Sequence, residues 1–271
     1  MGQASAILRQ SNPQIKAAQT NRVTKLWEQQ QLVAGRTAVG EPPVRPGRDD
    51  SKVRVVAPGK MPALGKGGSL ASRQAILHSL VHIESWAVDL SWDAVARFGS
   101  DPQYALPEAF LDDFVLVAND EASHFQQLQQ RLEAIGSFYG ALRVHDGLWE
   151  SAAATAHSLP ARLAVESCVH EARGLTGCPT PFTGSATAAM KSLQSYWRRY
   201  IRRRFRTVQL GMALHDWQAD AVKYDTVEEW FHGLVRAHFK GSLKPPFNEE
   251  ARAAAGFGPE WYLPLSSVIL Q

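Results

Sequence analysis

The stretch from Phe110 to Ile135 constrains the fold more than any other part of the chain. Its apolar residues recur at alternating steps of three and four, which predicts an amphipathic helix with one inward face. The residues on that face are Phe110, Phe114, Val117, Glu121, His124, Leu128, Leu132 and Ile135. A buried, unpaired charge is costly, so Glu121 and His124 need partners. A Glu-x-x-His pair facing a bundle core is typical of a metal site. The alternative is a core histidine paired with its own neighbour.

Two further helices carry a carboxylate on a face that the pattern places inward. Ser69 or Ser72 is positioned to begin the first, and Pro160 fits the first turn of the second, Ala161–Gly174. The expected core face of the first contains Ile76, Leu80, Ile83, Glu84, Ala87 and Leu90, and that of the second contains Ala164, Cys168, Glu171 and Leu175. Glu166 is a weaker candidate, with a salt bridge to Arg162 or Arg173 as its alternative role.

These residues match most of a four-helix di-metal pattern, which needs a Glu from each of two helices and Glu-x-x-His from each of the other two. Glu84 and Glu171 are the single carboxylates, Glu121 with His124 is the first pair, and the second pair is missing. Four histidines are expected to support the ligands or line an entrance, with simple packing as the alternative: His78, His82, His145 and His170.

Composition divides the chain into three parts and predicts an all-α fold. Residues 1–35 are expected to form an N-terminal helical segment, 36–69 a Pro/Gly-rich extended arm, and 70–271 the main helical domain. Within that domain we expect a short helical piece near Glu150–Ala156, a helix at Val227–Lys240, and a mostly irregular tail from Pro245 to Pro264.

Charge is concentrated in one segment. The net charge is +3, yet Ala172–His215 contains no acidic residue and eight basic ones, and the remaining 21 basic residues are outnumbered by 26 acidic ones. The atypical Arg-rich part spans about residues 176–216. No apolar run is long enough for a membrane helix, so we expect no membrane partner and a cytoplasmic protein. Cys168 and Cys178 lack a CxxC spacing and are expected to be free thiols.

Seven segments together resemble an uncharacterised ferritin-like family known as domain of unknown function four-five-five. They are Leu77–Glu84, Asn119–Phe125, Gly136–Gly140, His145–Glu150, His170–Leu175, Lys244–Asn248 and Ala254–Phe257. The resemblance covers most of the chain. It implies a ferritin-like four-helix bundle with a di-metal site, and it carries over Glu84, Glu121, His124 and Glu171 as ligands.

The chain departs from this family between Leu175 and about Trp217, where a fourth helix with Glu-x-x-His is expected. If suitable synonymous codons are chosen for Thr183–Gly211 and read one nucleotide out of phase, they encode an acidic amphipathic helix containing Glu-Ile-Ser-His. We therefore hypothesise that about residues 176–212 are frame-shifted or mis-spliced, which leaves the fourth helix disrupted. The alternative is a genuine basic, aromatic helix around Trp197 and Arg198–Arg206 that binds nucleic acid.

The intact pattern predicts a carboxylate-bridged di-iron or di-manganese site and an oxidation driven by O2 or a peroxide, with an unidentified small-molecule substrate. Since the fourth-helix ligands are missing, a metal-poor helical scaffold or interaction module is the main alternative. A basic nucleic-acid binder is the weaker one. A homodimer is left open.

Overall fold

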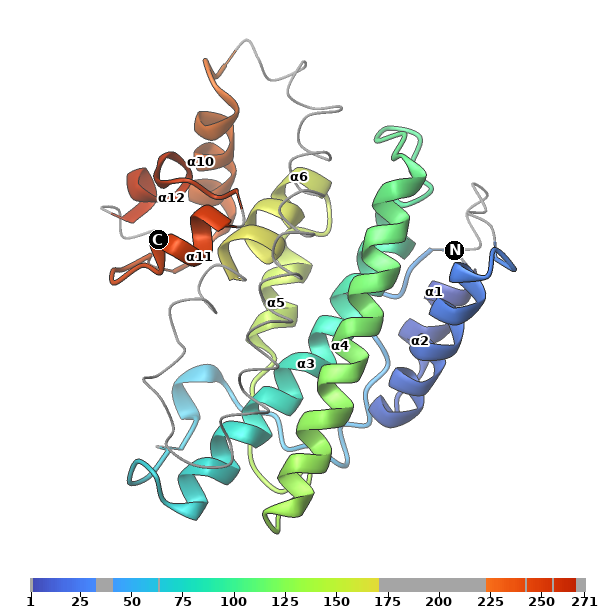
Figure 1. Ribbon diagram of the computed structural model, residues 1–271, viewed down its shortest axis with the longest axis vertical. Helices are drawn as coiled ribbons and strands as arrows, with labels where there is room; N and C mark the ends of the chain where they lie inside the picture. Colours follow the sequence, from blue (N-terminus) through green and yellow to red (C-terminus); the bar gives the residue numbers. More distant parts are fainter. Residues whose placement is uncertain are drawn as a thin grey trace. The chain divides into compact units, whose positions relative to one another are not determined.

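Within the residues that the computed structural model describes, the regular elements are helices (Figure 1). Within these residues the only β pairing is an isolated bridge between Val55 and Val144, so the all-α prediction is confirmed. Two compact units, Met1–Ala153 and Ala154–Gln271, are considered separately below. The expected fourth helix falls outside the described residues, and the ferritin-like bundle therefore stays a prediction. The described residues are 2–32, 41–62, 64–170, 223–241, 243–254 and 256–266.

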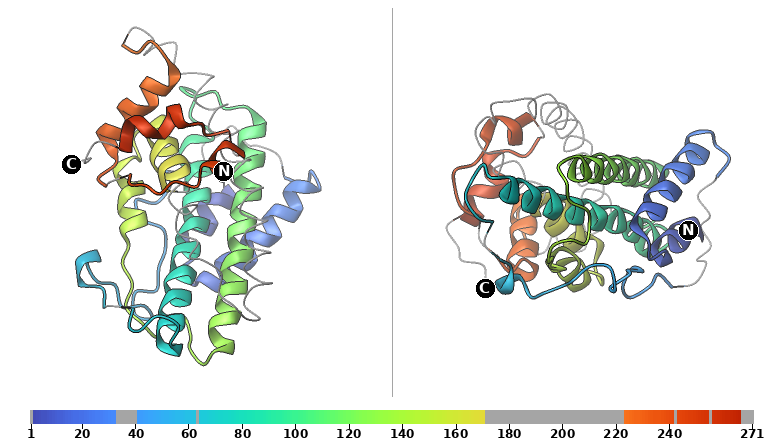
Figure 2. Two further views of the ribbon diagram at one scale, coloured as in Figure 1. Left: turned by 60° about the vertical axis from the view of Figure 1, so that its left-hand side comes forward. Right: turned by 90° about the horizontal axis from the view of Figure 1, so that it is seen from below.

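Two long helices form the centre of the first unit. They are α3 (Leu70–Phe98) and α4 (Glu108–Ala134), which lie side by side along much of their length (Figure 1 and Figure 2). Ser69 begins α3, as expected, because its side chain accepts a hydrogen bond from the backbone N–H of Ser72. On α4, Ala118 and Ala122 are fully buried, and such small side chains allow two helices to approach closely.

The core face expected for α3 was partly wrong. Ile76 is 37% exposed and Ile83 is 43% exposed, although Ala87 and Leu90 are buried as expected. Every residue from Glu84 to Ala96 is buried, so this part of α3 is covered on all sides, whereas Ile76 and Ile83 precede it. A helix that is buried all round has no single apolar stripe from which its inward face can be identified.

The N-terminal segment, which was expected to be helical, contains two helices. They are α1 (Gly2–Arg9) and α2 (Pro13–Glu28), and the Asn12 side chain caps α2 by accepting from the N–H groups of Gln14 and Ile15. In the fold, α1 packs on α3 and α2 packs on α4. The Trp92 indole donates to the Thr20 hydroxyl at 2.9 Å, which joins α3 to α2 through a buried polar contact.

The arm after α2 is fixed by backbone contacts. Gly47 donates to the Leu8 carbonyl, and a β-carbon at position 47 would come within 2.5 Å of the Arg9 carbonyl oxygen. A short 3-10 turn, η1 (Pro58–Lys60), follows the Val55 bridge. Beyond α4, the loop at 137–146 leads into α5 (Gly147–Ala154), where Trp149 stacks on Trp86 with ring centroids 5.5 Å apart.

The second unit differs from expectation at two places. The helix predicted at Ala161–Gly174 begins as α6 (Leu159–Arg162), capped by Ser158, and continues as a π-helix, η2 (Leu163–His170). Hydrogen bonds from i to i+5 alter the spacing of residues on one face, so an α-helical pattern fails there. The tail is largely helical rather than irregular. The remaining helices are α10 (Val227–His238), α11 (Glu249–Ala254) and α12 (Pro259–Ser266).

Among the described residues, we find no helix that combines the length and apolar character needed to cross a membrane.

Candidate metal centre

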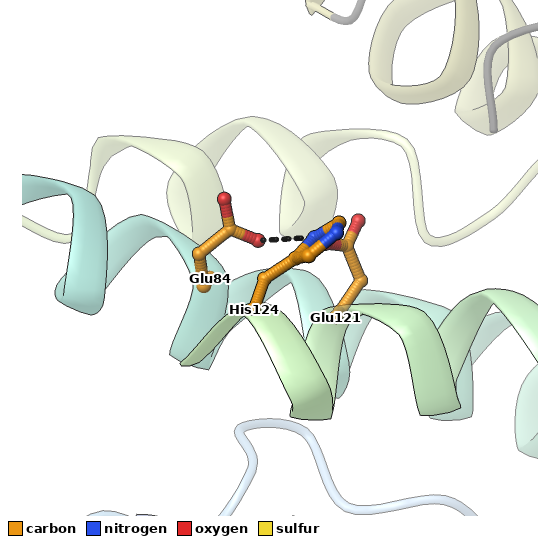
Figure 3. Close-up of side chains that lie close together, drawn as sticks. All are labelled: Glu84, Glu121 and His124. Atoms are coloured by element: carbon orange, nitrogen blue, oxygen red, sulfur yellow. Dashed lines mark hydrogen bonds and ion pairs between the residues drawn. The ribbon is translucent and has the colours of Figure 1, made fainter. Parts of the chain in front are cut away.

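Three of the four expected ligands lie together in the first unit. Glu84 comes from α3, while Glu121 and His124 come from α4, and their side chains point toward one another (Figure 3). One ligand atom from each lies within 4.8 Å of the other two. All three side chains are buried, as the inward positions on the two helices require.

The imidazole of His124 holds this cluster together. Its Nδ1 lies 3.0 Å from Oε2 of Glu121, one helical turn earlier, and 3.6 Å from Oε2 of Glu84 on the neighbouring helix. The i, i+3 spacing on α4 puts Glu121 and His124 on one face. The close packing of α3 against α4 then brings Glu84 to the same imidazole.

Burial and mutual repulsion control the charges in the cluster. Burial, together with repulsion from Glu121, raises the pKa of Glu84 well above its ordinary value. Burial alone would lower the pKa of His124, but its hydrogen bonds to Glu121 and Glu84 outweigh burial and raise that pKa to about 11. In the absence of a metal ion, a protonated imidazole therefore neutralises part of the carboxylate charge.

The donor set fits an iron or manganese ion. Two carboxylates and one imidazole are ligands that suit these metals, and a divalent ion would take over the charge neutralisation that the proton on His124 provides. These three residues would serve one ion. In the expected pattern, the further ligands of a two-metal site are Glu171 and a pair on the fourth helix, which lie outside the described residues.

Three of the four histidines expected to support the ligands, His78, His82 and His145, form hydrogen bonds in or beside the loop that follows α4. Nε2 of His78 accepts from the N–H groups of Gly140 and Leu142, at 2.9 and 3.3 Å. His82 contacts the Tyr139 hydroxyl at 2.8 Å, and Nδ1 of His145 accepts from the N–H of Gly147. The bonds of His78 and His82 anchor the loop to α3, whereas the bond of His145 is local. A supporting role for these histidines at the candidate metal centre stays a prediction.

Glu166 and His170 lie in the π-helix of the second unit. Glu166 is buried, and its Oε2 lies 4.0 Å from Nε2 of His170. π-Helical segments occur frequently at functional sites. The expected roles of Glu171 and His170 at the metal cluster remain predictions.

The sequence analysis missed a second polar cluster on α3. Asp89 is fully buried and forms ion pairs with Lys16 and Arg48. Nearby, Asp146 accepts from the Trp86 indole and from Arg45, and lies 3.4 Å from His82. One signal was present in the sequence: Asp89 follows His82 and Ser85 at helical spacing, which places the three on one face of α3.

Comparison with known proteins assigns a family. The model of a family described as "Protein of unknown function (DUF455)" matches residues 9–263. A stretch of 107 residues is 44% identical to an "Uncharacterized protein" of Haemophilus influenzae (strain ATCC 51907 / DSM 11121 / KW20 / Rd). That stretch covers 39% of this chain and 37% of the relative, so the match spans little more than a third of the relative's length. No solved structure matches the chain.

Proposed function

The chain belongs to this family of proteins of unknown function (DUF455), and we propose that it binds iron or manganese through Glu84, Glu121 and His124 to carry out an oxidation. The observation that supports this proposal is the buried meeting of two carboxylates and an imidazole, from two neighbouring helices, within 4.8 Å. Paired helices supply ligands in this way in helical-bundle metal proteins.

The bound metal would supply the electron-transfer chemistry by which O2 or a peroxide oxidises a small molecule. The side chains themselves would hold the ion and exclude water from it, since Glu84, Glu121 and His124 are each at most 7% exposed. A two-metal site is the fuller version of the proposal and requires ligands beyond His170. The substrate is an unidentified small molecule.

One observation favours a second function, a metal-poor scaffold or interaction module. The cluster satisfies itself without an ion, because His124 lies within hydrogen-bond distance of Glu121 and close to Glu84. An imidazolium between two carboxylates is a stable arrangement in a helical core. The two functions differ in what happens when metal is added.

Thermal unfolding with added Fe(II) or Mn(II) distinguishes the metal-binding function from the metal-poor scaffold. A ligand that binds only the folded chain stabilises it by about 2.7 kcal/mol at a concentration one hundred times its Kd, which corresponds to about 5 °C for a chain of this size. We expect this increase for the wild type and its loss in Glu121→Gln. Glu133→Gln is the matched control, because Glu133 is an exposed carboxylate on the same helix.

The oxidation is tested by O2 consumption of the iron-loaded chain in an oxygen electrode. Saturable consumption by the wild type and by Glu133→Gln, but not by Glu121→Gln, is the expected result. A melting temperature that does not change when either metal is added would instead support the metal-poor scaffold.

A further inference from the structure

A small pocket lies in the first unit, where the arm meets α2, α3 and the loop after α4. It has a volume of about 60 Å³, room for roughly four to six water-sized groups at about 10–15 Å³ each. The side chains that carry the argument are Arg45, Arg48, Lys52, Tyr139 and Asp146. None of these residues belongs to the candidate metal centre formed by Glu84, Glu121 and His124.

Arg48 is the central group of this pocket. Its side chain is 9% exposed, and its guanidinium lies 3.6 Å from the ring centroid of Trp86. Its two terminal nitrogens donate to the hydroxyl and carbonyl of Ser85 and to Asp89. Its Nε is buried and has no hydrogen-bond partner. A buried donor without an acceptor costs about 1–3 kcal/mol, so an acceptor beside Arg48 would be favourable.

The charges beneath the pocket do not balance. Asp89, which is fully buried, is shared by two buried cations, Arg48 and Lys16, whose Nζ lies 2.5 Å from the carboxylate. The triad therefore carries an excess positive charge in its neutral-pH form. Burial, and then repulsion from Arg48, lower the pKa of Lys16 despite the attraction of Asp89. An anion beside Arg48 would compensate this charge.

The rim of the pocket can accommodate such an anion. Arg45 and Lys52 add two more cations. Their partners Asp50 and Asp49 are 61% and 32% exposed, where solvent screens their charge, and Asp146, the second partner of Arg45, is 13% exposed. The start of α2 also lines the pocket, and its first turn contains no acidic residue. The lining carboxylates accept hydrogen bonds from Arg45, Ser51 or Trp86.

We propose that this pocket binds a small oxyanion, a phosphate or a short carboxylate, held by Arg48 and Arg45 beside the start of α2. The site is separate from the metal cluster, and its test does not depend on metal binding.

Isothermal titration of the full-length chain with inorganic phosphate, and separately with acetate, at constant ionic strength tests the proposal. Lys16→Met is the sharpest variant. It removes the excess charge but leaves Arg48 paired with Asp89, and Lys16 does not line the pocket. We expect at least tenfold weaker anion binding in this variant. Arg45→Gln removes a rim donor that is 38% exposed and should weaken binding as much, so it carries the test should Lys16→Met fail to fold.

Lys60→Gln is the control, since Lys60 is an exposed cation outside the pocket and its loss should leave affinity unchanged. Binding of phosphate alone or of acetate alone, each lost in Lys16→Met or Arg45→Gln, identifies the oxyanion. Absence of binding by either anion would overturn the proposal. So would binding that is equal in the wild type and both pocket variants, because the anion would then associate with surface charge in general.

Discussion

Asp89 is the residue on which the buried charges of the first unit depend. It alone faces both Lys16 and Arg48, and these three side chains join α2, α3 and the arm after α2. Breaking a buried ion pair by removing one partner is far more destabilising than losing an exposed pair, because the remaining charges stay buried.

We therefore expect Asp89→Asn to lower the free energy of unfolding by about 3–5 kcal/mol, measured by urea denaturation. Asp50→Asn is the matched control: it removes a carboxylate that is 61% exposed and pairs with Arg45. Its cost should be below about 1 kcal/mol. Equal losses in the two variants would show that the triad is not a buried charge cluster in solution.

His78 makes the stability of the folded chain depend on pH, and the direction of this dependence follows from its pKa. Burial, and then repulsion from His82, lower the pKa of His78 to about 4, and its Nε2 must be unprotonated to accept from Gly140 and Leu142. The unfolded chain therefore binds a proton more readily than the folded chain. The stabilisation from neutral His78 is complete above about pH 6.5 and is lost as the pH falls toward 4.

Replacing His78 by glutamine should remove this dependence, because an amide oxygen can accept the same two hydrogen bonds without titrating. We expect the free energy of unfolding, measured by urea denaturation, to fall by about 1 kcal/mol more in the wild type than in His78→Gln between pH 7 and pH 5. His157→Gln, a change at an exposed histidine, is the control. Parallel pH profiles for the wild type and His78→Gln would contradict this role.

At the scale of elements, the loop that follows α4 is set by backbone geometry as well as by His78. Gly140 has a φ of +107°, and a β-carbon there would lie 2.4 Å from the carbonyl oxygen of Lys52. Both the conformation and the lack of space require glycine. Because the loop carries Tyr139 and Asp146, its position also determines the shape of the pocket beside Arg48.

Gly140→Ala should therefore cost at least about 2 kcal/mol of stability in urea denaturation. Gly59→Ala is the matched control, since no atom lies within 4 Å of a β-carbon built at that position. It should change stability by less than about 1 kcal/mol. If Gly140→Ala were as stable as Gly59→Ala, the loop would have to adopt another conformation in solution.

The sequence predicted the inward face best for helices that have one buried face and one exposed face. The period of α4 predicted that Glu121 and His124 face inward, and both are buried. The same reasoning misplaced Ile76 and Ile83, which precede the part of α3 that is buried all round. It also missed the π-helix at Leu163–His170, which follows no α-helical period. The Asp89 triad joins three distant segments, and no local pattern reveals such a meeting.

At the scale of the whole molecule, the chain is an all-α member of its family, with Glu84, Glu121 and His124 brought together by α3 and α4. The segment expected to supply the last ligands lies at 171–222, outside the described residues. The frame-shift hypothesis for residues 176–212 therefore stays a prediction about the gene. A nucleotide read of the transcript across the codons for Gly174–Asp225 should show a change of phase that restores Glu-Ile-Ser-His. A single uninterrupted frame encoding the arginines would contradict it.

The metal content of the purified chain tests the central claim most directly. After incubation with Fe(II) or Mn(II) and removal of free metal, plasma mass spectrometry should find at least about one ion per chain in the wild type and in Glu133→Gln. Glu121→Gln should retain far less, because it loses one of three ligands in the cluster. Folded wild-type protein that retains neither metal, or equal retention in Glu121→Gln, would contradict a metal centre at Glu84, Glu121 and His124.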